Sequence, residues 1–239
     1  MNIKLKIFKI YMKYFYLYMF FLSILIIAMA FWNTVTQKNI NEGFTNTNNK
    51  SIVLMGDSIL KNNSYVKDGK NIENLIIERN PKIYCYAEDH SKISDIFYQI
   101  NKLPIELNTP NTYIFLSAGG NNILTHYVDQ NQDITDTSIL RPMFGAYKNL
   151  VKSIRTRLPQ AKIILLDIYY PDNLQYKQFH SIIKEWNGMI YDFAENPKNK
   201  IYGVIRISSH LTQNDDFSFG IEPSSSGGQK IANLILNMY

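Results

Sequence analysis

The feature that most constrains the fold of this chain is a repeated alternation between short apolar runs and segments of helical periodicity. Residues 51–55 form an apolar run stopped by Gly56, as expected for a strand buried on both faces. Similar runs cover residues 82–87, 113–118, 162–169 and 201–207. Between the runs, apolar residues recur every three or four positions, which predicts helices over 93–105, 139–158, 176–194 and 230–238.

Five strands alternating with helices predict an α/β fold. Right-handed crossovers then produce a mostly parallel sheet with helices on both faces. Ligand sites in such sheets form at the carboxyl ends of the strands. The loops to search for chemistry are therefore residues 56–58, 119–122, 169–171 and 221–228.

The distribution of charge argues against a nucleic-acid partner. The formal net charge of +5 is carried entirely by residues 1–50, so the rest of the chain has no net charge. A single cysteine, Cys85, excludes an intramolecular disulfide and a Cys-rich zinc site. The four histidines show no metal-ligand spacing, so no metal site is expected.

The N-terminal segment suggests a membrane anchor. Residues 1–13 carry four lysines, and the 19 residues 14–32 carry no charge. A helix of 19 residues is about 28 Å long, which is close to the thickness of the hydrocarbon core of a bilayer. The positive-inside rule leaves the N-terminus cytoplasmic and the body extracytoplasmic. A cleaved signal peptide, with Ala28-Met29-Ala30 as its site and a secreted product, and a buried soluble helix are the alternatives. We predict a flexible polar linker over residues 33–50 and a folded domain that carries the function over residues 51–239.

Gly56-Asp57-Ser58 follows the first predicted strand. A serine on a tight turn at a strand end has an exposed hydroxyl, and its own N–H can stabilise developing negative charge. Ser58 is therefore a candidate nucleophile. The alternative is that Ser58 only caps a following helix.

Gly119-Gly120-Asn121-Asn122 follows the third predicted strand. Glycine lets the backbone approach a bound group, and an asparagine amide is a neutral donor for an oxyanion. This predicts Asn121 in an oxyanion hole, with Gly120 and Asn122 contacting substrate. Taken alone, the segment is also typical of an ordinary turn.

With both motifs in this order, most of residues 51–239 resembles the SGNH, or GDSL-type, hydrolase superfamily of esterases, lipases and carbohydrate deacetylases. The resemblance implies a flavodoxin-like three-layer α/β/α sandwich with Ser58 as nucleophile and Asn121 as oxyanion donor. It implies no cofactor and no metal.

The chain departs from the family pattern at several positions. His90 stands where a glycine usually offers its N–H to the oxyanion hole, and Asn122 replaces an aspartate. In the last motif, Glu222 occupies the place of the catalytic histidine and Phe219 that of its aspartate. Ile221-Glu222-Pro223-Ser224 followed by Gly227-Gly228 resembles a branch of GDSL-like proteins.

Two side chains remain as candidates for the general base. A free glutamate is about two pKa units less basic than histidine, which costs about 3 kcal/mol of driving force. Burial of Glu222 against Phe219 and Ile221 is expected to recover part of this difference. His90 is the second candidate.

The sequence thus supports a serine ester hydrolase acting on acyl or O-acetyl groups of a lipid or glycan. The alternative is a catalytically impaired module of the same fold that binds an acylated or glycan ligand, as the missing histidine and aspartate suggest. Neither substrate identity nor oligomeric state follows from the sequence.

Overall fold

In the computed structural model the chain divides into two units, residues 1–48 and 49–239. The structure describes residues 12, 19, 22–24, 27–29, 50–67, 69–130 and 132–239. The predicted anchor and linker lie almost entirely outside the described residues, so both stay predictions. Among the residues that are described, no helix is both long and apolar enough to cross a membrane.

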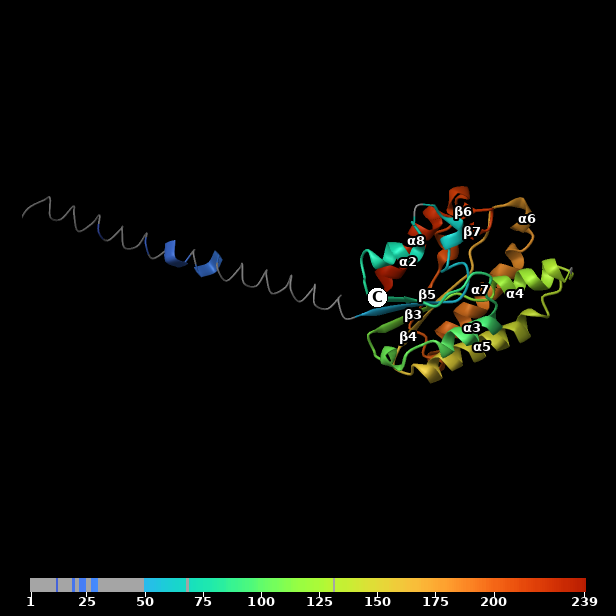
Figure 1. The fold of residues 1–239 in the computed structure, drawn as a ribbon, viewed down its shortest axis with the longest axis horizontal. Coiled ribbons are helices and arrows are strands. Elements are labelled where there is room, and N and C mark those ends of the chain that lie inside the picture. The colour runs from blue at the N-terminus through green and yellow to red at the C-terminus, as the bar shows by residue number, and fades with distance from the viewer. Residues whose placement is uncertain are drawn as a thin grey trace, which may run out of the picture. The chain divides into compact units, whose positions relative to one another are not determined.

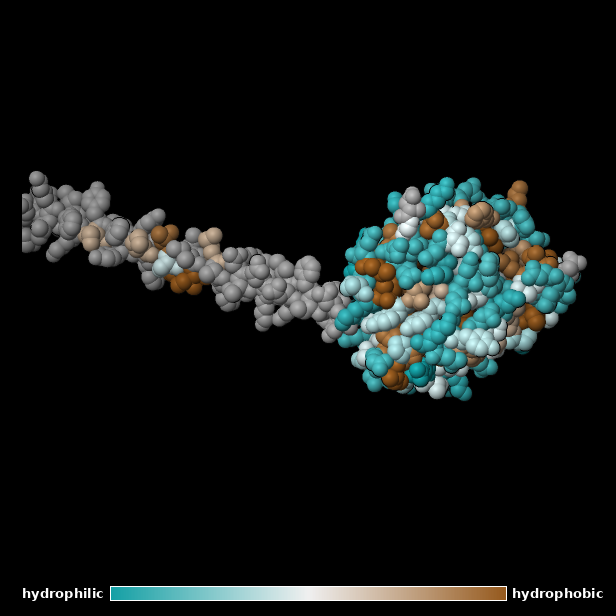
Figure 2. Space-filling model, viewed as in Figure 1, coloured by the Kyte–Doolittle hydropathy of each residue, from teal (hydrophilic) through white to brown (hydrophobic). Residues whose placement is uncertain are grey.

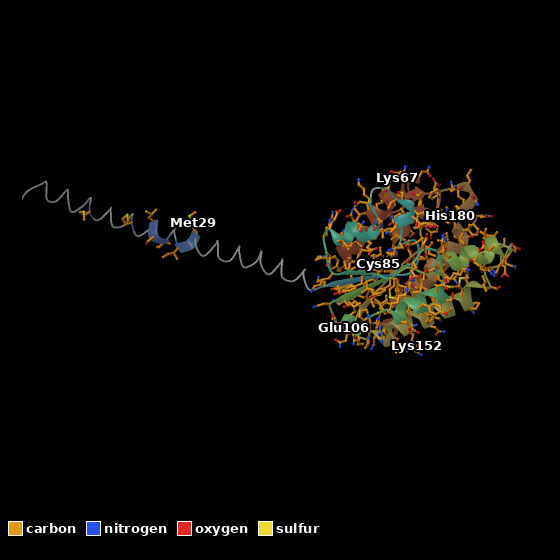
Figure 3. The ribbon with its side chains drawn as sticks, viewed as in Figure 1. Met29, Lys67, Cys85, Glu106, Lys152 and His180 are labelled. Carbon is orange, nitrogen blue, oxygen red and sulfur yellow. The ribbon has the colours of Figure 1, made fainter. Side chains whose placement is uncertain are left out.

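The second unit is built on one five-stranded sheet. Its strands are β1 (Ser51–Met55), β2 (Ile83–Cys85), β3 (Thr112–Leu116), β4 (Lys162–Leu166) and β5 (Gly203–Ile205). Their order is β2-β1-β3-β4-β5, and every neighbouring pair is parallel. Cys85, labelled in Figure 3, ends the edge strand β2. The predicted parallel α/β sheet is confirmed.

Helices cover both faces of this sheet (Figure 1). One face carries α2 (Ile72–Ile77) and α8 (Ser225–Met238), and the other carries α3 (Ile93–Asn101), α5 (Leu140–Arg157) and α7 (His180–Glu195). Alternate side chains of β1 explain the two cores: Ile52 and Leu54 pack with α2 and α8, whereas Val53 and Met55 pack on the opposite side. The result is the three-layer sandwich that the resemblance implies.

Several helix bounds differ from the predicted ones. The expected helix over 176–194 is two helices, α6 (Leu174–Lys177) and α7, while α2 was not predicted because six residues are too few to show a helical period. Helix α8 begins at Ser225 instead of residue 230, because the Ser224 hydroxyl caps it by accepting from the N–H groups of Ser226 and Gly227.

A small antiparallel hairpin, β6 (Phe217–Ser218) and β7 (Glu222–Pro223), precedes α8 and was also not predicted. Strands of two residues carry no readable alternation. The hairpin matters because it holds Glu222 at the carboxyl end of the parallel sheet.

The topology itself marks where a site can form. From β1 the chain moves outward to β2, then returns to β3 and continues through β4 to β5 on the other side. Strand order reverses between β1 and β3, whose last residues Met55 and Leu116 are paired. A crevice forms at such a switch point, because the following loops leave in opposite directions.

Candidate active site

The turn after β1 is held in a backbone conformation that requires glycine. Gly56 has φ +133°, and a Cβ added there would lie 2.1 Å from the carbonyl oxygen of Ser117. The Gln99 side chain of α3 pairs with Gly56, accepting from its N–H at 2.9 Å and donating to its carbonyl at 2.8 Å. These contacts fix the turn that presents Ser58.

Replacing Gln99 by methionine is expected to lower the free energy of unfolding by about 2 kcal/mol, because it leaves the buried N–H of Gly56 without a partner and its carbonyl with only the N–H of Glu88. Ester hydrolysis should fall as well, since the Ser58 turn loses its support. Chemical denaturation would measure the first effect. Gln160→Met, at an exposed glutamine, is the matched control, and equal stability of the two variants would contradict this role.

Asp57 lies beneath the nucleophile turn and is almost fully buried. Its Oδ1 accepts from the Ser117 hydroxyl at 2.7 Å and from the N–H of Ile59 at 3.2 Å, while its buried Oδ2 has no partner among the described residues. Burial raises the pKa of Asp57 to about 6. The hydrogen bonds of Asp57 thus hold the turn that presents Ser58. Both residues line the cavity described next.

A narrow cavity of about 50 Å³ opens beside Ser58. Its polar lining residues come from separate segments of the chain and include Asp57 and Ser58 after β1, Asn121 in α4 (Gly120–Leu124) and Glu222 in β7. Most of the others are apolar. The structure therefore brings together three of the side chains that the sequence singled out.

Asn121 and the Ser58 backbone place two donors at this cavity. The Asn121 Nδ2 donates one hydrogen to the carbonyl of Ser91 at 3.1 Å, which fixes the amide and leaves its second hydrogen available. The N–H of Ser58 has no partner in the described part of the chain. Two oriented donors near a serine hydroxyl are the elements of an oxyanion hole.

The neighbouring residues of the Gly-Gly-Asn-Asn loop divide into different roles. Gly119 has φ +113°, and a Cβ there would lie 2.3 Å from the ring of Trp186, so the loop requires glycine. Gly120 lines the cavity, and its contact with substrate stays a prediction. Asn122 does not line it: its Oδ1 accepts from the N–H of Ile93 at 2.9 Å, at the start of α3.

Glu222 lies within hydrogen-bonding reach of the Ser58 hydroxyl. The pKa of Glu222 is raised to about 7. Burial is the largest cause and the charges of Asp89 and Asp57 act in the same direction, whereas Ser58 and His90 lower the pKa. Its Oε2 is buried without a hydrogen-bond partner among the described residues. A carboxylate with this pKa is as basic as a histidine, whose ordinary pKa is about 6.5.

His90 is at the rim of the site. Its side chain is 79% exposed, and its ring Nε2 lies 3.8 Å from Asp89 Oδ2. Its backbone has φ +58°, a conformation suited to the glycine of the family pattern, and its N–H donates to Asp89 Oδ1 at 2.9 Å. The His90 N–H is therefore already occupied in this structure. His180, labelled in Figure 3, holds the loop after β4 through a 2.8 Å contact with the carbonyl of Pro171.

The expectation that Phe219 buries Glu222 was wrong. Phe219 has φ +52° in the turn of the β6–β7 hairpin, and its side chain is 81% exposed. Asp216, just before the hairpin, is fully buried and pairs with Lys230 at 2.7 Å. The backbone of Asp216 packs against Gly227, where a Cβ would lie 2.2 Å from its carbonyl oxygen.

Two supporting residues, Asn62 and Tyr65, were missed in the sequence. Asn62 is fully buried; its amide donates to the carbonyl of Pro223 at 3.3 Å and accepts from the N–H of Ile72 at 2.9 Å. It thereby ties the loop after Ser58 to the residue that follows Glu222. Tyr65 donates to the carboxylate of Asp89 at 2.7 Å. No spacing rule connects these residues, since all their contacts are tertiary.

Within the described residues, no cluster of three or more histidine, cysteine, aspartate or glutamate side chains could hold a metal ion.

Comparison with known proteins identifies the fold. No protein-family model and no curated protein matches the sequence. Solved structures do match. A lipase from a goat rumen metagenome aligns at a TM-score of 0.63 and 15% identity, over 79% of this chain and 97% of that chain.

Two further structures are similar at somewhat higher identity. A lipolytic G-D-S-L family protein of Veillonella parvula has a TM-score of 0.57 and 21% identity, over 80% of this chain and 98% of that chain. A family 3 carbohydrate esterase of Clostridium thermocellum has a TM-score of 0.54 and 20% identity, over 79% of this chain and 94% of that chain. The chain has the SGNH/GDSL hydrolase fold, as its sequence motifs predicted.

Proposed function

We propose that this protein is a serine ester hydrolase in which Ser58 is the nucleophile and Glu222 the general base. The observation that carries the proposal is the contact between the Ser58 hydroxyl and a largely buried carboxylate whose pKa is about 7. A base works best when its pKa lies near the operating pH. The similarity in fold to lipases and carbohydrate esterases supports the same reaction class.

In the first half of the reaction, the Ser58 Oγ attacks the ester carbonyl carbon while its proton passes to Glu222. The negative charge on the former carbonyl oxygen is stabilised by the Ser58 N–H and the free Asn121 N–H. Collapse of this intermediate breaks the bond to the alcohol oxygen, which takes the proton from Glu222. The products are a free alcohol and an acyl group on Ser58.

In the second half, water replaces the alcohol. Glu222 accepts a proton from water, which attacks the acyl carbonyl, and the same donors hold the oxyanion. Collapse returns the proton to Ser58 Oγ and releases the acid. A carboxylate has no N–H with which an aspartate could orient it. Here the β6–β7 hairpin and Asn62, which binds the next carbonyl, are the elements that position it.

Covalent labelling tests the nucleophile directly. A fluorophosphonate probe forms a bond from the serine oxygen to phosphorus and releases fluoride, so the purified protein should gain the mass of the probe at Ser58. Ser58→Ala should remain unlabelled, whereas Ser64→Ala, at an exposed serine, should label normally. An unlabelled wild-type protein that also lacks ester turnover would instead support the ligand-binding module.

A further inference from the structure

We infer that the site takes neutral esters with a short aliphatic acyl chain of about four to six carbons, rather than O-acetyl groups or acids with a second negative charge. This inference rests on the proposed function and specifies its substrate class. It follows from the lining, the size and the charge of the cavity beside Ser58.

Beyond Asp57, Ser58, Asn121 and Glu222, the lining of the cavity is largely apolar. Its apolar residues come from α4, the loop after β4, α6, the junction before α7 and α7 itself: Ile123, Leu124, Ile168, Tyr176, Phe179 and Ile183. Aliphatic side chains and phenyl rings form no hydrogen bond with a glycan hydroxyl, so a hydroxyl buried among them would lack a partner. They suit methylene groups, each worth about 0.8 kcal/mol when buried.

The size of the cavity sets the chain length. A volume of about 50 Å³ accommodates roughly three to five groups of the size of a water molecule or a methylene. An acetyl group would leave most of this space unfilled. A chain much longer than six carbons would exceed this volume.

The charge around Ser58 selects against anions. The carboxylates of Asp57 and Glu222 both belong to residues that line the cavity, and the charges of Asp57 and Asp89 contribute to the raised pKa of Glu222. No lysine or arginine is among the residues that line the cavity in the described part of the chain. A carboxylate on the acyl chain would therefore enter an apolar cavity already flanked by like charge.

Figure 2 shows one face of the body. That face is largely hydrophilic, and its hydrophobic residues form small separate areas.

The experiment is a chain-length series of p-nitrophenyl esters with two, four, six, eight and twelve acyl carbons, each with Ser58→Ala as background. We expect kcat/KM to peak at four to six carbons, at least about 10-fold above the acetate. Leu124→Ala enlarges the cavity and should raise the ratio of octanoate to butyrate hydrolysis about 10-fold. Leu234→Ala, a half-buried leucine in the opposite core, should leave that ratio unchanged.

A second series tests charge at constant length. Mono-p-nitrophenyl glutarate, which carries a terminal carboxylate, should be hydrolysed at least about 10-fold more slowly than p-nitrophenyl pentanoate. Equal rates would overturn the preference for neutral esters. A Ser58-dependent optimum at acetate, unchanged in Leu124→Ala, would overturn the acyl-cavity assignment while leaving the esterase proposal intact.

Binding measurements test the acyl-cavity assignment separately from the proposed hydrolysis. Acyl p-nitroanilides of the same lengths are poorly hydrolysed analogues, and their affinity for Ser58→Ala can be measured by calorimetry. Tightest binding at four to six carbons, without turnover of any ester, would support the cavity assignment and contradict the proposed function. Binding that does not depend on chain length would overturn the inference.

Discussion

Glu222→Gln is expected to lower kcat/KM for ester hydrolysis by about 10³- to 10⁴-fold. Glutamine has the same shape and can still accept a hydrogen bond from Ser58, but it cannot take the proton. The loss should appear in kcat with little change in KM, because Glu222 acts on the reacting hydroxyl. Steady-state kinetics of the purified variant on p-nitrophenyl butyrate measures this.

The same substitution should not damage the fold, which separates loss of the base from unfolding. The pKa of Glu222 is raised from 4.5 to about 7, so the folded protein binds this proton more tightly than the unfolded chain. Stability is therefore lost as pH rises from about 4.5 to about 7. At pH 8 Glu222→Gln should be more stable than wild type by about 1–2 kcal/mol, with little difference below pH 4.5.

The pH profile of the wild type is the corresponding readout of the base. Because Glu222 must be deprotonated to act, kcat/KM should rise to a plateau with a midpoint near pH 7. His90→Ala should leave this midpoint within a few tenths of a unit, since the His90 ring is mostly exposed and contacts Asp89. A midpoint abolished by His90→Ala would make histidine the base and contradict our assignment.

Asn121→Ala is expected to lower kcat by about 10²- to 10³-fold, because it removes one of two oxyanion donors. The effect on KM should be small, since the donor is needed most when the carbonyl oxygen becomes negative. Stability should fall only slightly, as the one bond lost is that to the Ser91 carbonyl. Kinetics on butyrate esters and thermal unfolding measure the two effects.

Asn122→Ala is the matched control for Asn121. Its side chain accepts from the N–H of Ile93 and does not line the cavity, so its loss should cost about 1 kcal/mol of stability and leave kcat within about 3-fold. A large loss of activity in Asn122→Ala with unchanged Asn121→Ala would reverse the roles we assign to the two residues.

The β6–β7 hairpin limits what substitutions toward the usual SGNH last motif, aspartate at 219 and histidine at 222, can achieve. Phe219 stands where the aspartate is expected, but its side chain is 81% exposed at a turn of positive φ. An aspartate at position 219 would lie in solvent instead of beside residue 222. Glu222→His alone is therefore the informative substitution, because the hairpin has no position ready to orient a histidine from 219.

Sequence by itself determined the layers of this protein and located two of its candidate site residues, Ser58 and Asn121. Short continuous apolar runs and helical segments of period 3.6 are local signals, and they predicted the parallel sheet and most of its helices. Gly56-Asp57-Ser58 and Gly119-Gly120-Asn121-Asn122 could be located because each directly follows a strand. Their closeness then follows from the switch in strand order between β1 and β3.

Only the tertiary structure decided the surroundings of Glu222 and therefore its pKa. The basicity of Glu222 depends on burial and on Asp57 and Asp89, which are far from it in sequence. The hydrogen bonds between Gln99 and Gly56 also join residues that are far apart in sequence. So do the bonds of Asn121 to Ser91 and of Asn122 to Ile93, which give the two asparagines different surroundings. Strand and helix patterns follow from local chain geometry, whereas a pKa and an orientation depend on every group that packs nearby.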